Sequence, residues 1–281
     1  MEKLPELNTL ILPAFLTITR SKRFKAAVYS NASSFFLPNI GGKKLKKYKA
    51  FFDLREEFPL SYFYLLSQVA QVNQMLNKDF PLPIPGMIHL ETQMTYLAEP
   101  MEEEALQIVS DVIINNKEEG SLLPLFIESY FQKGVKIVEV KSRYLVKRKS
   151  NKKKIKPETI EENETDETNW LAFKWFLKNN TGIKYARLSG DYNPIHISTP
   201  LAWLFGFKKK IIHGWYLLSR AVSEIEKETN MPAKSIEVNF LKAVNHPSKV
   251  DFEFRLSNRR NLEFRIRRKK DDEAAVSGYI S

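Results

Sequence analysis

Apolar residues recur at helical spacing in two well separated parts of the chain. The first set comprises Tyr62, Leu65, Leu66, Val69, Val72, Met75 and Leu76. The second set comprises Trp215, Leu218, Ala221, Val222 and Ile225. Pro59 precedes the first set and a proline-rich stretch at 81–85 follows it, as is typical of the two ends of a helix. We therefore predict two long helices that are apolar over most of their surface, and so are wrapped by other structure.

Each predicted helix is followed by several strand patterns. After the first helix, strand-like stretches cover 87–96, 106–114, 122–130 and 135–146, with a hairpin turn at 117–120. After the second, apolar and polar residues alternate over 236–240, 250–256 and 262–266, and a last strand covers 275–280. One helix followed by several long antiparallel strands, seen twice, predicts a duplicated α+β unit.

A charged segment separates the two patterns. A run rich in lysine at 147–156 is followed by a run rich in glutamate at 158–167, and neither has apolar periodicity. We predict an N-terminal unit at 1–147, an exposed linker at 148–167 and a C-terminal unit at 168–281. Residues 1–58 give a weaker pattern. The lysine cluster at 43–49 beside Gly41 and Gly42 is expected to be a solvated loop, with a phosphate contact as the alternative.

Composition narrows the class of protein. The chain has 281 residues, of which 43% are hydrophobic, so a sizeable core can form. It has no cysteine, which excludes disulfides, thiolate metal sites and a cysteine nucleophile. The apolar run at 10–16 is too short to span a bilayer and lacks a signal-peptide layout, so a cytoplasmic protein is expected.

The net charge of +11 predicts attraction to polyanions. Nucleic acid, an acidic membrane face, a phosphorylated cofactor and an acidic carrier protein are all candidates, and charge alone does not choose among them. The sequence has no zinc-finger or homeodomain pattern and no basic stretch interleaved with stacking aromatics, so we do not expect a nucleic-acid partner.

One segment carries candidate chemistry. It runs from Leu188 to His196 and is followed by Ile212-His213-Gly214. Gly190 is expected to end a short helix, and Asp191 to Pro194 has the composition of a turn. The loop presents a carboxylate, Asp191, and an imidazole, His196, which can both reach one water molecule, the minimum set for general acid–base work. The alternative is a common Asx turn followed by a packed histidine.

The whole string resembles the MaoC-like family of hot-dog hydratases, the (R)-specific enoyl-CoA hydratases. The matching positions are Ser189, Gly190, Asp191, Asn193, Pro194, Ile195, His196, Ala202, Gly206, Phe207, His213 and Gly214. The first half resembles the N-terminal unit of bacterial two-domain members at 58–62, 80–83 and 86–89, but it lacks the Asp-x-Asn-Pro-x-His string. The resemblance implies a double hot-dog, with a degenerate N-terminal unit that supports the substrate and a C-terminal unit that reacts. We expect His89, in the first half, to be a structural residue of the sheet.

The resemblance also implies roles for single residues. Asp191 and His196 would hold the water that adds to a trans-2-enoyl thioester, giving an (R)-3-hydroxyacyl thioester, or would run the reverse dehydration. The N–H of Gly214, at a predicted helix start, would bind the thioester oxygen. Asn193 would fix the loop and orient His196. Trp215 stands where the family usually has methionine, and its indole is expected to shorten or reshape the acyl pocket.

A hydro-lyase of fatty acyl metabolism follows from this resemblance, with no metal and no other cofactor required. Its partner would be a thioester of coenzyme A or of acyl carrier protein, both anionic, and pairs of chains could form a homodimer. Two alternatives stay open. One is a hot-dog thioesterase that directs the water at the carbonyl carbon. The other is a non-catalytic module that binds acyl carriers.

Overall fold

The computed structural model describes residues 1–20, 26–115, 121–147, 169–257 and 261–281. The first half of the chain contains helices α1 (Leu7–Leu16), α2 (Lys43–Phe52) and α3 (Leu60–Leu76), with a short 3₁₀ turn, η1, at Thr17–Thr19. Its strands are β1 (Glu2–Lys3), β2 (Val28–Leu37), β3 (Ile88–Tyr96), β4 (Leu106–Asn115), β5 (Ser121–Leu122), β6 (Leu125–Gln132) and β7 (Val135–Lys147).

The second half begins after the charged segment predicted as a linker, and that linker lies outside the described residues. Its helices are α4 (Thr181–Ser189), α5 (Pro194–Ile197), α6 (Thr199–Leu204) and α7 (Gly214–Thr229). Its strands are β8 (Leu171–Leu177), β9 (Ser235–Phe240), β10 (Ser248–Leu256), β11 (Leu262–Arg268) and β12 (Ala274–Ile280). None of the helices in the described ranges is long and apolar enough to cross a membrane.

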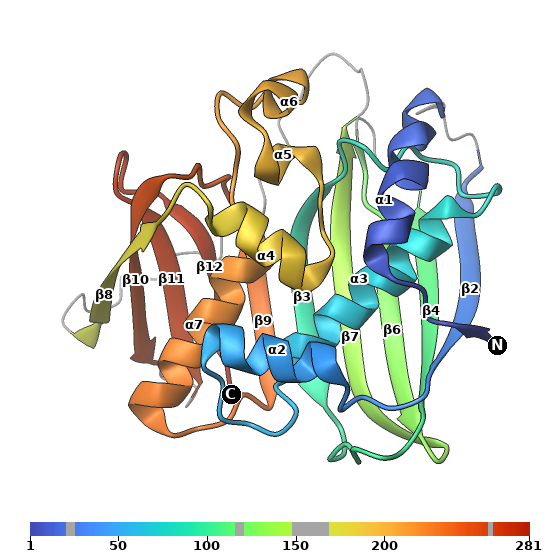
Figure 1. Ribbon diagram of the computed structural model, residues 1–281, viewed down its shortest axis with the longest axis horizontal. Coiled ribbons are helices and arrows are strands. Elements are labelled where there is room, and N and C mark those ends of the chain that lie inside the picture. Colours follow the sequence, from blue (N-terminus) through green and yellow to red (C-terminus); the bar gives the residue numbers. More distant parts are fainter. Residues whose placement is uncertain (21–25, 116–120, 148–168, 258–260) are drawn as a thin grey trace.

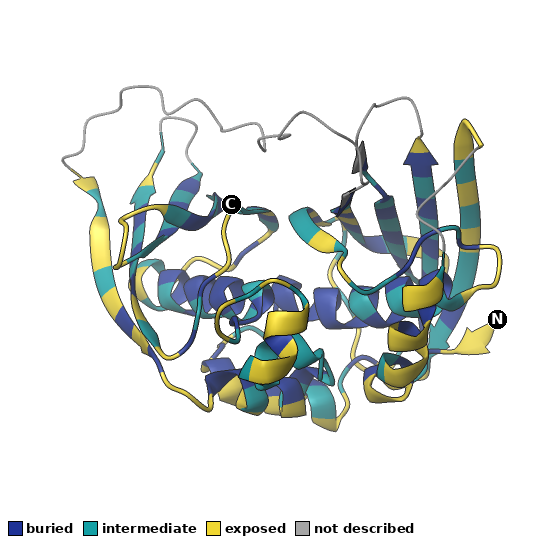
Figure 2. Ribbon diagram, turned by 90° about the horizontal axis from the view of Figure 1, so that it is seen from above, coloured by how far each residue is buried: buried dark blue, intermediate teal, exposed yellow. Residues whose placement is uncertain are grey.

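The strand order shows the duplication directly. The first half forms the order β2-β4-β6-β7-β3, and the second half repeats it as β8-β10-β11-β12-β9 (Figure 1). The halves meet edge to edge, because β3 pairs with β9 antiparallel, from Glu91 opposite Asn239 to Thr95 opposite Ser235. The result is one continuous sheet that arches over the two long helices, as Figure 2 shows from above. The predicted double hot-dog of class α+β is confirmed.

The long helices α3 and α7 are central, and Glu228 is the one residue of the two that is exposed. Most of α3 is buried, including Leu60, Phe63 and Leu65, so sheet and helices enclose it on nearly all sides. Along β4 and β10 the burial alternates residue by residue, since successive side chains of a strand point to opposite faces. The inward set of each strand packs on the helices, and this fixes the register.

The expectation of a solvated loop at 43–49 is wrong. These residues form α2, in which Leu45, Tyr48 and Phe52 make a buried stripe while Lys43, Lys46 and Lys47 face solvent. The helix is stabilised by packing rather than by its own composition. Helix α1 and strand β2 were also missed. Pro13 lies inside α1, where proline is unfavourable, and the alternation in β2 is carried by serine, asparagine and alanine, which give little hydrophobic contrast.

A buried hydroxyl on α2 joins the two long helices. The Tyr48 hydroxyl lies 2.7 Å from Ser219 Oγ on α7 and 3.0 Å from Ser61 Oγ on α3. Ser219 Oγ donates to the Trp215 carbonyl and accepts from the Tyr48 hydroxyl, which also lies within hydrogen-bond distance of Ser61 Oγ as an acceptor. The three hydroxyls therefore link α2, α3 and α7 across the junction between the halves.

We expect Tyr48→Phe to lower the free energy of unfolding by about 1–2 kcal/mol, because it leaves two buried serine hydroxyls each short of a partner. Urea unfolding of the full chain measures the change. Phe51→Leu, at a more exposed position of the same helix, serves as the control and should cost less. Equal midpoints for Tyr48→Phe and the unsubstituted chain would contradict this account of the junction.

Candidate active site

The loop between α4 and α5 is held by local hydrogen bonds. Gly190 ends α4 with φ of 86°, a left-handed conformation that favours glycine. The Asp191 N–H donates to Ser189 Oγ (3.1 Å), and Asp191 Oδ1 accepts from the Asn193 N–H (3.1 Å). Asn193 Oδ1 in turn accepts from the Ile195 N–H (3.3 Å) and so caps α5. The predicted turn is present, and Asn193 fixes its far end.

His196 is oriented by the chain that follows α6. Its Nδ1 lies 2.9 Å from the Ile211 carbonyl oxygen, which can only accept. The partner therefore assigns the ring proton to Nδ1 in the neutral imidazole, and Nε2 keeps a lone pair. Burial lowers the pKa of His196, although the nearby Asp191 carboxylate opposes this. A neutral His196 near pH 7 is thus a proton acceptor at Nε2.

A second histidine stacks on the first. The rings of His196 and His213 lie 3.7 Å apart between centroids, at 28°. His213 Nε2 donates to the Asp191 carbonyl oxygen (3.0 Å) and so holds the loop. Burial lowers the pKa of His213 to about 3, so its imidazole stays neutral under ordinary conditions. One nitrogen or carboxylate oxygen from each of Asp191, His196 and His213 lies within 4.8 Å of the others.

The Asp191 carboxylate is ionised despite its surroundings. Burial on its own would raise its pKa, but His213, His196 and the Gln68 amide act in the opposite direction. Their combined effect holds the pKa of Asp191 below its ordinary value. The site therefore pairs a carboxylate with a neutral imidazole, which is the protonation state that general acid–base work on water requires.

One contact to this carboxylate comes from the other half of the chain. Gln68 Nε2, on α3, donates to Asp191 Oδ2 (2.9 Å). Gln68 is not among the residues predicted from the sequence. The available signal was weak, because Gln68 is one of several amide and hydroxyl side chains along α3, and only those with buried partners need an explanation. The site is therefore built by both halves and lies where α3 and α7 run close together.

Gly214 and Trp215 begin α7 beside this loop. Gly214 is the first residue of the helix, where the N–H groups have no acceptor within the helix. A Cβ on Gly214 would lie 2.6 Å from the Phe240 ring, so glycine permits the close approach of β9. Trp215 is buried, its Nε1 donates to the Ser61 carbonyl (3.0 Å), and its ring stacks 3.8 Å from that of Tyr64. The indole is thereby fixed between the two halves.

The aromatic contacts continue into the first half. The Tyr64 hydroxyl lies 3.1 Å from His89 Nδ1, and the His89 ring stacks on that of Tyr144 at 4.7 Å. His89 Nε2 lies 2.7 Å from Thr92 Oγ1, so both ring nitrogens have partners. The structural role expected for His89 fits these contacts. Burial lowers its pKa to about 3, so this imidazole is neutral too.

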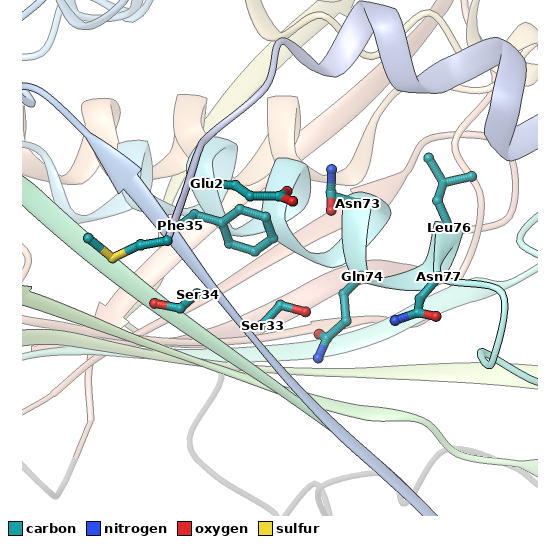
Figure 3. Close-up of a pocket in the computed structure, with 9 residues that line it drawn as sticks. Glu2, Ser33, Ser34, Phe35, Asn73, Gln74, Leu76 and Asn77 are labelled. Carbon is teal, nitrogen blue, oxygen red and sulfur yellow. The ribbon is translucent and has the colours of Figure 1, made fainter.

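A cavity of about 570 Å³ lies elsewhere, beside the N-terminal strand, β2 and the end of α3 (Figure 3). Glu2, Ser33, Asn73 and Gln74 are among its lining residues. The lining contains no histidine and no second carboxylate side chain, so it offers no acid–base pair comparable to Asp191 and His196. We therefore place the candidate active site at the loop rather than in this cavity.

Comparison with known families and structures fits this geometry. The sequence profile of the "MaoC like domain" family matches residues 147–277. No curated protein sequence matches the chain. Among solved structures, HtdX of Mycobacterium tuberculosis superposes with a TM-score of 0.70 at 19% identity, covering 89% of this chain and 99% of that one.

Two further structures mark the range of similar folds. A MaoC-like dehydratase from Phytophthora capsici has a TM-score of 0.65 at 18% identity, covering 91% of this chain and 95% of its own. A protein described as a putative oleoyl thioesterase from Lactobacillus plantarum has a TM-score of 0.54 at 11% identity, covering 91% and 94%. At these identities the structural matches establish the fold, here the double hot-dog, and leave the chemistry to the site.

Gly182 on α4, which the sequence analysis did not single out, lets the histidine loop approach closely. A Cβ there would overlap the His196 carbonyl oxygen and lie 2.8 Å from His246 Nε2. His246 Nε2 donates to that same carbonyl (3.1 Å). The backbone of His196 is thus held between α4 and the segment before β10, with no room for a side chain at Gly182.

We expect Gly182→Ala to lower the free energy of unfolding by about 1–3 kcal/mol, because the added methyl group overpacks the His196 backbone. Thermal or urea unfolding measures it. Gly42→Ala is the matched control, since a Cβ there meets only Asn39 Oδ1 at 3.7 Å. If the two substitutions had the same effect, the close approach at Gly182 would not be a constraint.

Proposed function

We propose that this chain, which carries a MaoC-like domain at residues 147–277, catalyses the reversible hydration of trans-2-enoyl thioesters to (R)-3-hydroxyacyl thioesters. The observation that carries the proposal is the convergence of an ionised Asp191 and a neutral His196 on one side of a fixed loop. The domain match supports the dehydratase class. The substrate and the direction are our inference.

The proposed chemistry needs only the side chains of the site. His196 Nε2 accepts one proton from the water, the remaining O–H donates a hydrogen bond to the Asp191 carboxylate, and the water oxygen forms a bond to the β-carbon. Electron density from the carbon–carbon double bond moves to the α-carbon and the thioester oxygen. The protonated His196 then returns its proton to the α-carbon. Atoms balance as the addition of one water, and dehydration is the same path reversed.

Negative charge on the thioester oxygen requires a donor. The N–H of Gly214 at the start of α7 is the donor that we propose, because a helix N-terminus carries unpaired N–H groups and a favourable dipole. Removing one such donor typically costs about 3–4 kcal/mol of transition-state stabilisation. Asn193 would act through the loop rather than on the substrate.

We propose a division of labour between the halves. Residues 168–281 would supply the reacting groups, residues 1–147 would support them, and 148–167 would link the two. The Gln68 contact to Asp191 supports this division, because it is a first-half side chain acting on a second-half carboxylate. The stack of Trp215 on Tyr64 would form a wall of the acyl pocket at the junction, which would limit the pocket's depth.

We expect Asp191→Asn and His196→Gln each to reduce hydration by about 10²–10⁴-fold while leaving the chain folded. Loss of the enoyl absorbance of crotonyl-CoA measures hydration, and chiral analysis of the product identifies the (R) isomer. A free-thiol assay runs in parallel. Thiol release without loss of the enoyl group would instead favour a thioesterase. Full activity in either variant, or an (S) product, would overturn the proposal.

The pH profile tests the state of the pair. Because the pKa values of Asp191 and His196 lie below their ordinary values, hydration should persist as pH falls through the ordinary histidine range and be lost only at lower pH. Gln68→Leu removes a donor to the carboxylate, so the pKa of Asp191 rises. The acid limb of kcat/KM should then move to higher pH, by about one unit.

The control for this profile is Gln93→Leu, at an exposed position of β3, which should leave the acid limb where it is. A Gln68→Leu enzyme that loses activity equally at every pH would show a merely structural role. An unchanged pH profile of kcat/KM in Gln68→Leu would show that Gln68 has no effect on the reaction.

A further inference from the structure

Acidic residues are nearly absent from two long stretches of the chain. Residues 7–52 contain nine lysines and arginines and no aspartate or glutamate. Residues 168–223 contain eight lysines and arginines, and their one acidic residue is Asp191, which belongs to the site. These stretches include α1, α2 and α4, which lie in front of the sheet, and α5 and α6, which project above it (Figure 1). We call these five helices and the segments between them the helical side. The excess of positive charge is therefore concentrated in these two stretches.

Several of the cations on this side face solvent. Lys43, Lys46 and Lys47 on α2, Lys184 and Arg187 on α4, and Lys208 and Lys209 after α6 are exposed. Within the ranges that the structure describes, none of these seven forms an ion pair. Helix α2 packs against α4, through contacts such as that of Phe52 with Tyr185 at 6.0 Å between ring centroids. The exposed cations of α2 and α4 therefore lie on neighbouring helices.

Large apolar side chains project from the same side. On α6, Trp203 is 63% exposed and Leu204 is 75% exposed. On α1, Leu12 and Leu16 are 68% and 65% exposed. The two helices touch through Phe15 and Phe205, whose ring centroids lie 6.3 Å apart. We call α6 and the outward side of α1 the apolar lobe. A surface of this kind marks an interaction site rather than an ordinary monomer surface.

The apolar lobe borders the candidate active site. A Cβ on Gly190, the residue before Asp191, would lie 3.2 Å from Leu7 Cβ, so α1 packs directly on the catalytic loop. Helix α6 follows His196 after a few residues, and Trp203 Nε1 donates to the Lys208 carbonyl (2.7 Å). That bond satisfies the polar atom of the exposed indole and ties it to the lysine-rich segment. Trp203 thus presents an apolar ring with cations beside it.

We infer that the helical side docks the protein on the surface of an anionic phospholipid bilayer. Cations spread over α2, α4 and the 208–209 segment match a plane of lipid phosphates, and Trp203, Leu204, Leu12 and Leu16 would enter the outer part of the acyl layer. Charge alone would suit any polyanion. The exposed apolar lobe favours a bilayer, because neither a nucleic-acid backbone nor a soluble acidic surface would cover those side chains.

The test is co-sedimentation of the full chain with vesicles, which does not depend on turnover. We expect binding to phosphatidylglycerol-containing vesicles at low salt, at least tenfold stronger than to pure phosphatidylcholine, and weakened by high salt. Lys46→Gln with Lys47→Gln should weaken binding about tenfold to thirtyfold, since each cation near an anionic surface contributes about fivefold. Trp203→Ser with Leu204→Ser should weaken it at least tenfold.

Matched controls are available away from the helical side. Leu256→Ser removes an apolar side chain of similar exposure at the end of β10. Lys269→Gln with Lys270→Gln removes two charges after β11. Both should bind vesicles like the unsubstituted chain. Thermal unfolding of each variant checks that it is folded.

Three outcomes would overturn the inference. The first is failure to bind anionic vesicles at low salt. The second is binding that depends on the lysines but not on Trp203 and Leu204, and that a DNA duplex or an acidic carrier protein displaces. The third is a dimer in sedimentation equilibrium that Trp203→Ser with Leu204→Ser dissolves, because a second copy would then cover the lobe.

Discussion

The antiparallel pairing of β3 with β9 is the constraint on which the rest of the molecule depends. It joins the two sheets edge to edge and thereby sets α3 and α7 close together beneath them. Only in that arrangement can Gln68 of one half reach the carboxylate of Asp191 in the other, and only there can Trp215 stack on Tyr64. A sheet edge is also the part of a strand that otherwise presents unpaired backbone groups. The pairing of β3 with β9 satisfies the backbone groups of both edges. It also holds the two halves in the positions that bring the residues of the site together.

The charge state of the site depends on two opposing effects on the pKa of Asp191. Burial raises this pKa, and the neighbouring polar groups lower it. Burial disfavours every charged form, so it lowers the pKa of His196 and His213 and would raise that of Asp191. Donated hydrogen bonds from Gln68 and the Asn193 N–H, together with the two imidazoles, reverse the outcome for the carboxylate alone. The loop thus holds an ionised Asp191 beside a neutral His196. These protonation states depend on the neighbouring groups and not on the residue types alone.

Local sequence patterns predicted the parts of this molecule that local physics decides. The two long helices, the alternating strands and the turn at Asp191 all follow from spacing within a few residues, and all are present. Helix α2 escaped prediction because its buried stripe of Leu45, Tyr48 and Phe52 is interleaved with lysines, so its helicity depends on contacts with α3, α4 and α7. Gln68 and Gly182 escaped for a related reason. Each matters through a partner more than ten residues away, and a single sequence does not reveal which distant backbone or carboxylate will lie beside it.

Helix α4, which leads into the Asp191 loop, has most of its uncharged side chains buried and its cations exposed. On α4, Tyr185 faces inward with its ring 4.8 Å from that of His213, while Lys184 and Arg187 face solvent, so the cations lie on the outer side of the helix. A positive potential of that kind acts over roughly a Debye length, about 10 Å at moderate salt, so it reaches the loop. It favours the ionised form of Asp191 from outside, as Gln68 does from inside. The absence of other acidic residues from 168–223 therefore has a physical consequence for the site, because any additional carboxylate there would oppose both effects.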